Sequence, residues 1–97
     1  MALYRVRFAR KATADLQSMM PELIARIVDA CGALGADPYP AGKKMKRLAG
    51  VTPPTYRLRV GDYRALYEVN QSPREVRVLR VVHRSHLDRA MRALSTG

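Results

Sequence analysis

The chain has 97 residues, of which 47% are hydrophobic, and it carries a formal net charge of +10. This length suits one domain with one modest core, so residues 1–97 are expected to fold as a unit, and the hydrophobic content argues against disorder. A charge of this size predicts a polyanionic partner: nucleic acid, an anionic membrane surface or an acidic protein. A basic surface that only keeps the protein in solution is the alternative.

The basic residues gather in the second half of the chain. Residues 43–64 hold seven basic residues and one acid, Asp62, whereas residues 1–42 hold five basic and four acidic residues. Cys31 is the single cysteine, which excludes a disulfide within the chain and fits a reducing compartment. Charges interrupt the apolar run at the start, and no run is long enough for a membrane span, so the sequence predicts a cytoplasmic protein without membrane contact.

The first half of the chain predicts one strand and two helices. Residues 2–9 alternate in polarity, which predicts a half-buried strand with three inward side chains: Tyr4, Val6 and Phe8. A short helix is expected to begin at Ala12 or Thr13, with Thr13 as a candidate N-cap. A second helix begins at Pro21 and keeps its apolar residues on one face: Leu23, Ile24, Ile27, Val28, Cys31 and Leu34.

The second half predicts a loop, three strands and a helix. Residues 37–54 contain four prolines and two glycines and are expected to be loop, with the basic cluster "KKMKR" (43–47) inside it. A hairpin over 55–69, a strand over 76–83 and a terminal amphipathic helix follow. The order β-α-α-β-β-β-α predicts an α+β fold, in which a helical hairpin covers one face of an antiparallel sheet. The other face is expected to be free.

The hairpin "TYRLRVGDYRALYEV" has a predicted two-residue turn at Gly61-Asp62. This turn fixes the register, with Val60 opposite Tyr63 and Arg59 opposite Arg64. One face then belongs to the core: Tyr56, Leu58, Val60, Tyr63, Ala65, Tyr67 and Val69. The other face carries mostly charge: Arg57, Arg59, Arg64, Leu66 and Glu68.

A like-charge pair such as Arg59 and Arg64 destabilises a sheet. An anion bound between them would reverse this effect, because the planar arginine fork donates two parallel hydrogen bonds to a phosphate. Two arginines extended into water are the alternative. His83 and Arg84 end the strand over 76–83 and would join this patch if that strand neighbours the hairpin. Its face is left open, because its apolar residues break strict alternation, as a β-bulge would.

The stretches "LAGVTPPTYRLRVGDYRALYEV" and "VRVLRVVHRSHLDR" resemble the RelE/ParE superfamily of toxins from bacterial toxin–antitoxin pairs. The resemblance covers nearly the whole chain and implies two N-terminal helices packed on an antiparallel sheet. RelE-like members cleave mRNA in the ribosomal A site, where the 2′-OH attacks the adjacent phosphate. ParE-like members share the fold and inhibit DNA gyrase without nuclease activity.

The resemblance also implies which residues are catalytic. The basic positions of RelE-like enzymes fall here on Arg57, Arg59, Arg64 and Arg84, and His83 is the candidate for proton transfer. Arginine stays protonated, so the proton acceptor is open between His83, His86, Lys46 and a ribosomal group. The family often has a tyrosine after the late arginine, whereas "HRSHLDRA" has none, so base stacking would come from His86 or His83 or would be absent.

The expected function is therefore that of a ribosome-dependent mRNA endonuclease toxin that needs no metal or cofactor. The alternatives are a ParE-like gyrase inhibitor and a non-toxic, basic nucleic-acid-binding domain. Expected partners are the ribosome, mRNA and a small acidic antitoxin whose amphipathic helix masks the arginines or displaces the terminal helix. The residues expected to bind RNA are Lys43, Lys44, Lys46, Arg47 and His86.

Overall fold

The computed structural model describes residues 3–39, 42, 45–48 and 54–96. Its main elements, in chain order, are β1 (Arg5–Phe8), α1 (Arg10–Gln17), α2 (Pro21–Gly32), β2 (Met45–Arg47), β3 (Tyr56–Val60), β4 (Tyr63–Gln71), β5 (Arg74–His83) and α3 (Leu87–Thr96). Two short 3-10 helices, η1 (Ala33–Gly35) and η2 (Arg84–His86), follow α2 and precede α3. This order confirms the predicted α+β fold and adds one strand to it.

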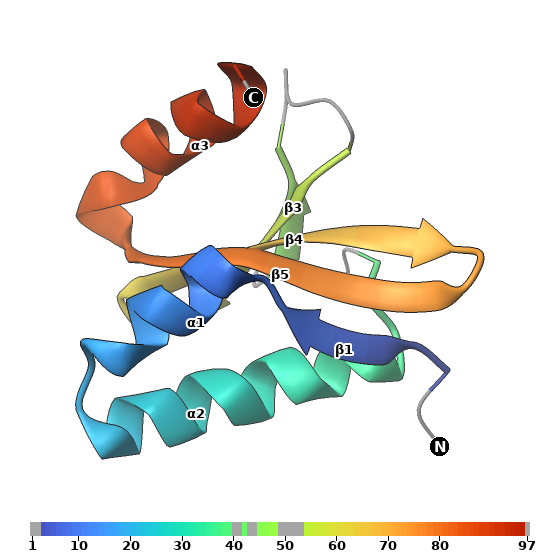
Figure 1. Ribbon diagram of the computed structural model, residues 1–97, viewed down its shortest axis with the longest axis horizontal. Coiled ribbons are helices and arrows are strands. Elements are labelled where there is room, and N and C mark those ends of the chain that lie inside the picture. Colours follow the sequence, from blue (N-terminus) through green and yellow to red (C-terminus); the bar gives the residue numbers. More distant parts are fainter. Residues whose placement is uncertain (1–2, 40–41, 43–44, 49–53, 97) are drawn as a thin grey trace.

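The five strands form one sheet in the order β1-β5-β4-β3-β2 (Figure 1). β1 runs parallel to β5, and the other neighbours are antiparallel. The added strand β2 lies inside the segment predicted to be loop, so that prediction was wrong for Met45–Arg47. Three residues are too few to show an alternating pattern, and β2 is held by pairing with β3 and by a 2.8 Å hydrogen bond from Leu48 N to Thr55 O.

The helix α1 begins at Arg10, two to three residues before the predicted start. Ala9 occupies the N-cap, and its carbonyl accepts a 3.0 Å hydrogen bond from Thr13 N, so the prediction of Thr13 as N-cap was wrong. The cause lies in the preceding strand: Ala9 N still donates to Val78 O at 2.8 Å, and the chain turns into a helix directly after this bond. Pro21 opens α2 as predicted.

Two separate hydrophobic clusters lie on opposite sides of the sheet. The larger one packs α1 and α2 on the sheet and buries Ile27, Cys31 and Tyr67 completely. The smaller one lies under α3, which Figure 1 shows on the other side of the sheet, and is formed by Leu48, Leu66, Val82 and Ala90. The expectation of a free second face was therefore wrong. Leu66 is the reason, because its side chain points to that face and is 0% exposed under α3.

A β-bulge sets the direction of the side chains at the end of β5. Tyr67 pairs with Val78 and Leu66 with Arg80, which leaves Leu79 between the two pairs. Beyond the bulge, Val82 lies opposite Arg64 and His83 lies opposite Tyr63. Successive side chains alternate between faces, so His83 points to the side of α1 and α2. In the part of the chain that is described, no helix is long and apolar enough to cross a membrane.

Candidate nucleic-acid interface

The β3–β4 hairpin has the predicted register. Gly61 takes a φ of 59° at the turn, a conformation that glycine adopts without strain, and Arg59 lies directly opposite Arg64. Arg57 lies opposite Leu66, so the three arginines project on the α3 side of the sheet. We call this surface, together with Arg84, the arginine face.

Arg84 joins the arginine face through the hairpin turn. Its backbone N–H donates to Asp62 O at 2.7 Å, and its Nε lies 3.7 Å from Asp62 Oδ1. Both side chains are about two-thirds exposed, at 65% and 67%, so the ion pair itself adds little stability. The backbone bond is the firmer link, and it fixes the start of η2 beside the turn that carries Arg64.

Arg64 is the centre of the positive charge. Its Nη1 donates to Gly61 O at 3.0 Å and to Tyr63 O at 2.9 Å, which folds the side chain against the turn. Burial, and then the charges of Arg57, Arg59 and Arg84, lower the pKa of the Arg64 guanidinium. Burial and the neighbouring charges both disfavour the charged guanidinium, and an anion at this position would offset the repulsion.

Lys46 extends the arginine face, and Arg57 within it carries a buried donor. Lys46 on β2 lies opposite Arg57 and therefore projects on the same side of the sheet. The Nε of Arg57 is buried and has no hydrogen-bond partner among the described residues, although most buried donors in proteins have one. The arrangement therefore offers guanidinium groups and a concentrated positive charge, which together suit the oxygens of a phosphate.

Other residues predicted to share this site lie elsewhere. His83 points to the opposite face, where its ring meets that of Tyr63 edge-on, with centroids 5.4 Å apart. Its Nδ1 accepts a 3.2 Å hydrogen bond from Ser85 N, so the proton of the neutral ring lies on Nε2. His86 lines the same side as His83. Arg47 lies opposite Tyr56 and so faces away from Arg57, and Lys43 and Lys44 lie outside the described residues.

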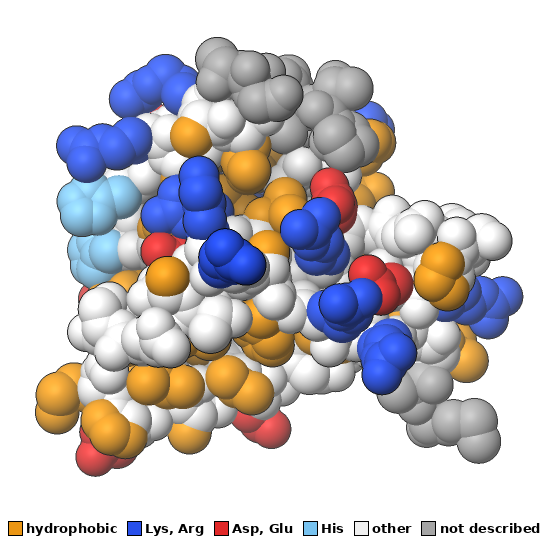
Figure 2. Space-filling view, viewed as in Figure 1, with side chains coloured by type: hydrophobic (Ala, Val, Ile, Leu, Met, Phe, Trp, Pro, Cys, Tyr) orange, Lys and Arg blue, Asp and Glu red, His pale blue; other side chains and the backbone are white. Residues whose placement is uncertain are grey.

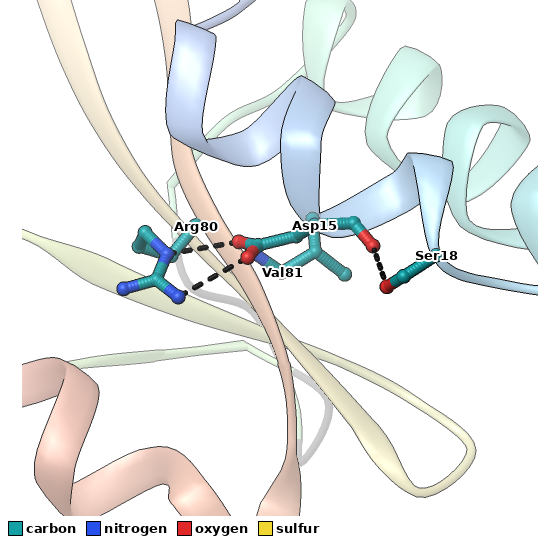
Figure 3. Close-up of polar contacts among 4 residues, drawn as sticks. All are labelled: Asp15, Ser18, Arg80 and Val81. Atoms are coloured by element: carbon teal, nitrogen blue, oxygen red, sulfur yellow. Dashed lines mark hydrogen bonds and ion pairs between the residues drawn. The ribbon is translucent and has the colours of Figure 1, made fainter.

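Asp15 has a role that the sequence reasoning missed. Its carboxylate accepts hydrogen bonds from Arg80 Nε at 2.9 Å, Arg80 Nη2 at 3.1 Å and Val81 N at 2.8 Å (Figure 3). Val81 lies beyond the last residue of β5 that pairs with β1, so Asp15 replaces the missing strand neighbour. The one signal in the sequence was Arg80, a charge inside the apolar run "VLRVV", but nothing there names its partner 65 residues away.

The described residues contain no group of three or more His, Cys, Asp or Glu side chains that could hold a metal ion. On the arginine face, guanidinium groups in a fixed arrangement can bind a phosphate and stabilise charge that develops on it.

Comparison with known proteins identifies the family of this chain. Residues 6–87 match the family model of the ParE toxin of the type II toxin–antitoxin system parDE. This chain is a toxin of the RelE/ParE family. The toxin is 39% identical over 88 residues to Toxin RelG of Mycobacterium tuberculosis, a match that covers 89% of this chain and 97% of the relative.

Solved structures of the family agree with the fold of the toxin. The archaeal RelE–RelB complex from Pyrococcus horikoshii matches with a TM-score of 0.71 and 30% identity, over 84% of this chain and 96% of that one. The toxin–antitoxin complex RelBE2 from Mycobacterium tuberculosis matches with a TM-score of 0.68 and 35% identity, over 86% and 93%. A mutant of E. coli RelE in the free state, 17% identical, matches with a TM-score of 0.75 over 99% and 96%, which shows the shared fold alone.

Proposed function

We propose that this toxin is a ribosome-dependent mRNA endonuclease, in which the arginine face binds the phosphate that is cleaved. The observation that carries the proposal is the convergence of four arginines around the hairpin turn, where burial and then the charges of the other three lower the pKa of Arg64. A like-charge pair across two strands costs stability. A phosphate bound between the two arginines would offset this loss of stability.

In this proposal the 2′-OH of one nucleotide attacks the adjacent phosphate, and the 5′ oxygen of the next nucleotide leaves. Arg59 and Arg64 bind the phosphate oxygens and stabilise the extra negative charge of the pentavalent transition state. Arg84 reaches the same phosphate from the end of β5, and Asp62 positions it. Arg57 and Lys46 extend the positive surface along the RNA backbone.

Proton transfer is assigned by the same geometry. Arginine is a poor proton acceptor because it stays charged, and His83 lies on the opposite face with its Nδ1 bound to Ser85. Lys46 is then the protein group on the arginine face that could accept the 2′-OH proton, which requires its amine to be neutral, and a ribosomal group is the other candidate. Dependence on the ribosome follows naturally if the proton acceptor is ribosomal.

We also propose a cognate antitoxin as the regulatory partner. The structural relatives from Pyrococcus horikoshii and Methanococcus jannaschii are complexes of RelE with RelB. A net charge of +10 favours an acidic partner. The α3 helix lies beside the arginines on the same face, so an antitoxin that covers this face or displaces α3 would block access to RNA.

Primer extension on mRNA from a translation reaction tests the nuclease. Cuts at ribosome-occupied codons are expected with the toxin, and Arg64→Ala should lower their rate by about 100-fold or more, the usual effect of removing one preorganised stabilising group. Arg74→Ala is the matched control, because Arg74 is exposed at the far end of β5. The ParE family match keeps gyrase as the second target. Intact mRNA together with trapped gyrase–DNA complexes would overturn the nuclease proposal in favour of that target.

A further inference from the structure

Arg26 on α2 reaches the same hairpin turn that carries Arg64. A Cβ atom at Gly61 would lie 3.4 Å from Nη2 of Arg26, so the tip of this side chain is in contact with the turn. The helix α2 packs on the side of the sheet opposite the arginine face, and Arg26 therefore approaches the turn from that opposite side. The proposed site for the cleaved phosphate does not use this arginine.

The helix itself does not explain the direction of the Arg26 side chain. Arg26 is the single basic residue of α2, with Glu22 four residues before it and Asp29 three residues after it. Such spacings commonly give ion pairs along a helix, yet none of the ion pairs among the described residues includes Arg26. Figure 2 shows acidic and hydrophobic side chains along the bottom of the molecule, where α2 lies, and Lys and Arg side chains above them. The guanidinium of Arg26 thus leaves two nearby carboxylates and extends to the hairpin turn.

The acceptors of the turn are already used by two other arginines. Gly61 O accepts from Arg64 Nη1 at 3.0 Å, and Asp62 O accepts from Arg84 N at 2.7 Å. The carboxylate of Asp62 lies 3.7 Å from Arg84 Nε and makes no ion pair with Arg26. Arg26 is exposed, and a guanidinium carries five N–H donors. Those of Arg26 make no hydrogen bond within the described part of the chain, so they are available to a ligand at the turn.

The turn therefore carries positive charge on both of its sides. Arg64 and Arg84 lie against it on the arginine face, and Arg26 lies against it on the side of α2. Arg26 adds charge at a place where the other arginines already repel one another, so an anion is the partner that suits it. An RNA strand that leaves the arginine face over the end of the hairpin passes Arg26 next.

We propose that Arg26 binds the phosphate next to the one that is cleaved, where the RNA strand crosses the hairpin turn. The inference rests on the proposed nuclease function and extends its RNA site across the turn to α2. The planar guanidinium can donate two parallel hydrogen bonds to a phosphate. This contact takes no part in the chemistry. It holds the strand so that the cleaved phosphate stays in place against Arg59 and Arg64.

Binding of a fluorescent octaribonucleotide to the toxin, measured by anisotropy at several salt concentrations, tests the proposal. Arg26→Gln should weaken binding about tenfold, the loss of one charged hydrogen-bonded contact. It should also reduce the slope of log K against log salt by about 0.7, the value for one phosphate on a single strand. Arg26→Lys should keep the slope, because a lysine also neutralises a phosphate. Arg74→Gln is the matched control, since it removes the same charge at the exposed far end of β5 and should leave the slope unchanged.

A dinucleotide separates the two phosphate positions, because it contains a single phosphate. Arg64→Gln should weaken its binding, which is followed by NMR, since that phosphate is held by the arginine face. Arg26→Gln should change the affinity less than twofold, because the neighbouring phosphate is missing. The midpoint of urea unfolding should be the same for Arg26→Gln and the wild-type toxin, because the exposed guanidinium has no partner among the described residues to lose.

Three results would overturn the role of Arg26. The first is that Arg26→Gln binds the octaribonucleotide with the wild-type affinity and slope, and a loss of mRNA cleavage in that variant would then indicate a contact with the ribosome. The second is an equal loss of affinity for the dinucleotide and the octaribonucleotide. In the third, the urea midpoint falls and Arg26→Lys does not restore binding, which would make Arg26 a support of the turn. In each case, codon-specific cuts by the wild-type toxin would leave the nuclease proposal standing, so the two failures are distinguishable.

Discussion

Arg59 on β3 and Arg64 on β4 lie directly opposite each other in the hairpin, and Arg64 binds the carbonyl oxygens of Gly61 and Tyr63. Burial, and then the charges of Arg57, Arg59 and Arg84, lower the pKa of Arg64. The like-charge pair therefore lowers the stability of the protein, and the fold does not require it. Mutation of the pair should therefore change stability and activity in opposite directions, whereas most mutations change the two together.

The first prediction uses that separation. Arg59→Gln should raise the free energy of unfolding by a few tenths of a kcal/mol, because it removes a like-charge pair, and should still reduce mRNA cleavage. Urea denaturation and primer extension measure the two effects. Arg74→Gln, which removes the same charge at the far end of β5, is expected to change neither. A loss of stability in Arg59→Gln would show that the pair is not repulsive in the folded protein.

The second prediction concerns the contact between α1 and the edge of β5. Asp15→Ala should lower the free energy of unfolding by about 2–3 kcal/mol, because it removes charged hydrogen bonds and leaves a partly buried Arg80 and Val81 N–H without an acceptor. Urea denaturation gives the value. The control is Glu75→Ala, which breaks the 3.4 Å ion pair with the largely exposed Arg7 and should cost less than about 1 kcal/mol. Equal costs would show that Asp15 is an ordinary surface acid.

The third prediction concerns Tyr67 in the main core. Its hydroxyl donates a 2.6 Å hydrogen bond to Pro38 O, and its side chain is 0% exposed. Tyr67→Phe should cost about 1–3 kcal/mol, because the buried carbonyl loses its donor. Tyr4→Phe is the comparison, since it removes an exposed hydroxyl that donates to Gln71, and a change within about 0.5 kcal/mol is expected. Thermal and urea unfolding should rank the two variants in this order.

The fourth prediction concerns Cys31. Burial raises the pKa of its thiol from 9.0 to about 12, so the folded protein holds it protonated and unreactive. At pH 8 a thiol reagent should modify the native toxin slowly and the urea-unfolded toxin rapidly. Because the thiol titrates in the unfolded chain first, its contribution to stability is present below pH 9 and is lost as the pH rises toward 12. Cys31→Ala should show a smaller loss of stability over that window. Rapid modification of the native toxin would contradict the burial.

The hairpin could be predicted from the sequence because two local rules agree. A glycine-containing turn fixes which residues are opposite, and the alternation of side chains then assigns every residue to a face. Those rules placed Arg57, Arg59 and Arg64 together, and the structure has the same pairing. The candidate arginine face was thus available from the sequence alone.

The remaining parts depend on contacts distant in the chain. The bulge at Leu79 decides the face of His83, and it depends on pairing with β4. The strand β2 is three residues long and exists because β3 offers it an edge. The position of α3 on the sheet had one signal in the sequence, the apolar Leu66 among the arginines, and this signal was missed. The hollow between the α1–α2 junction, the end of β5 and the start of α3 could not be predicted from the sequence, because separate parts of the chain form it.

The parallel pairing of β1 with β5 has a consequence for synthesis. Arg5 to Phe8 bond to Glu75 to Val78, so the first strand made has no partner until about three-quarters of the chain has left the ribosome. Arg84 comes later still, and it completes the arginine face through Asp62. Pairing between such distant segments also forms slowly. The arginine face is therefore completed late in the synthesis of the described residues.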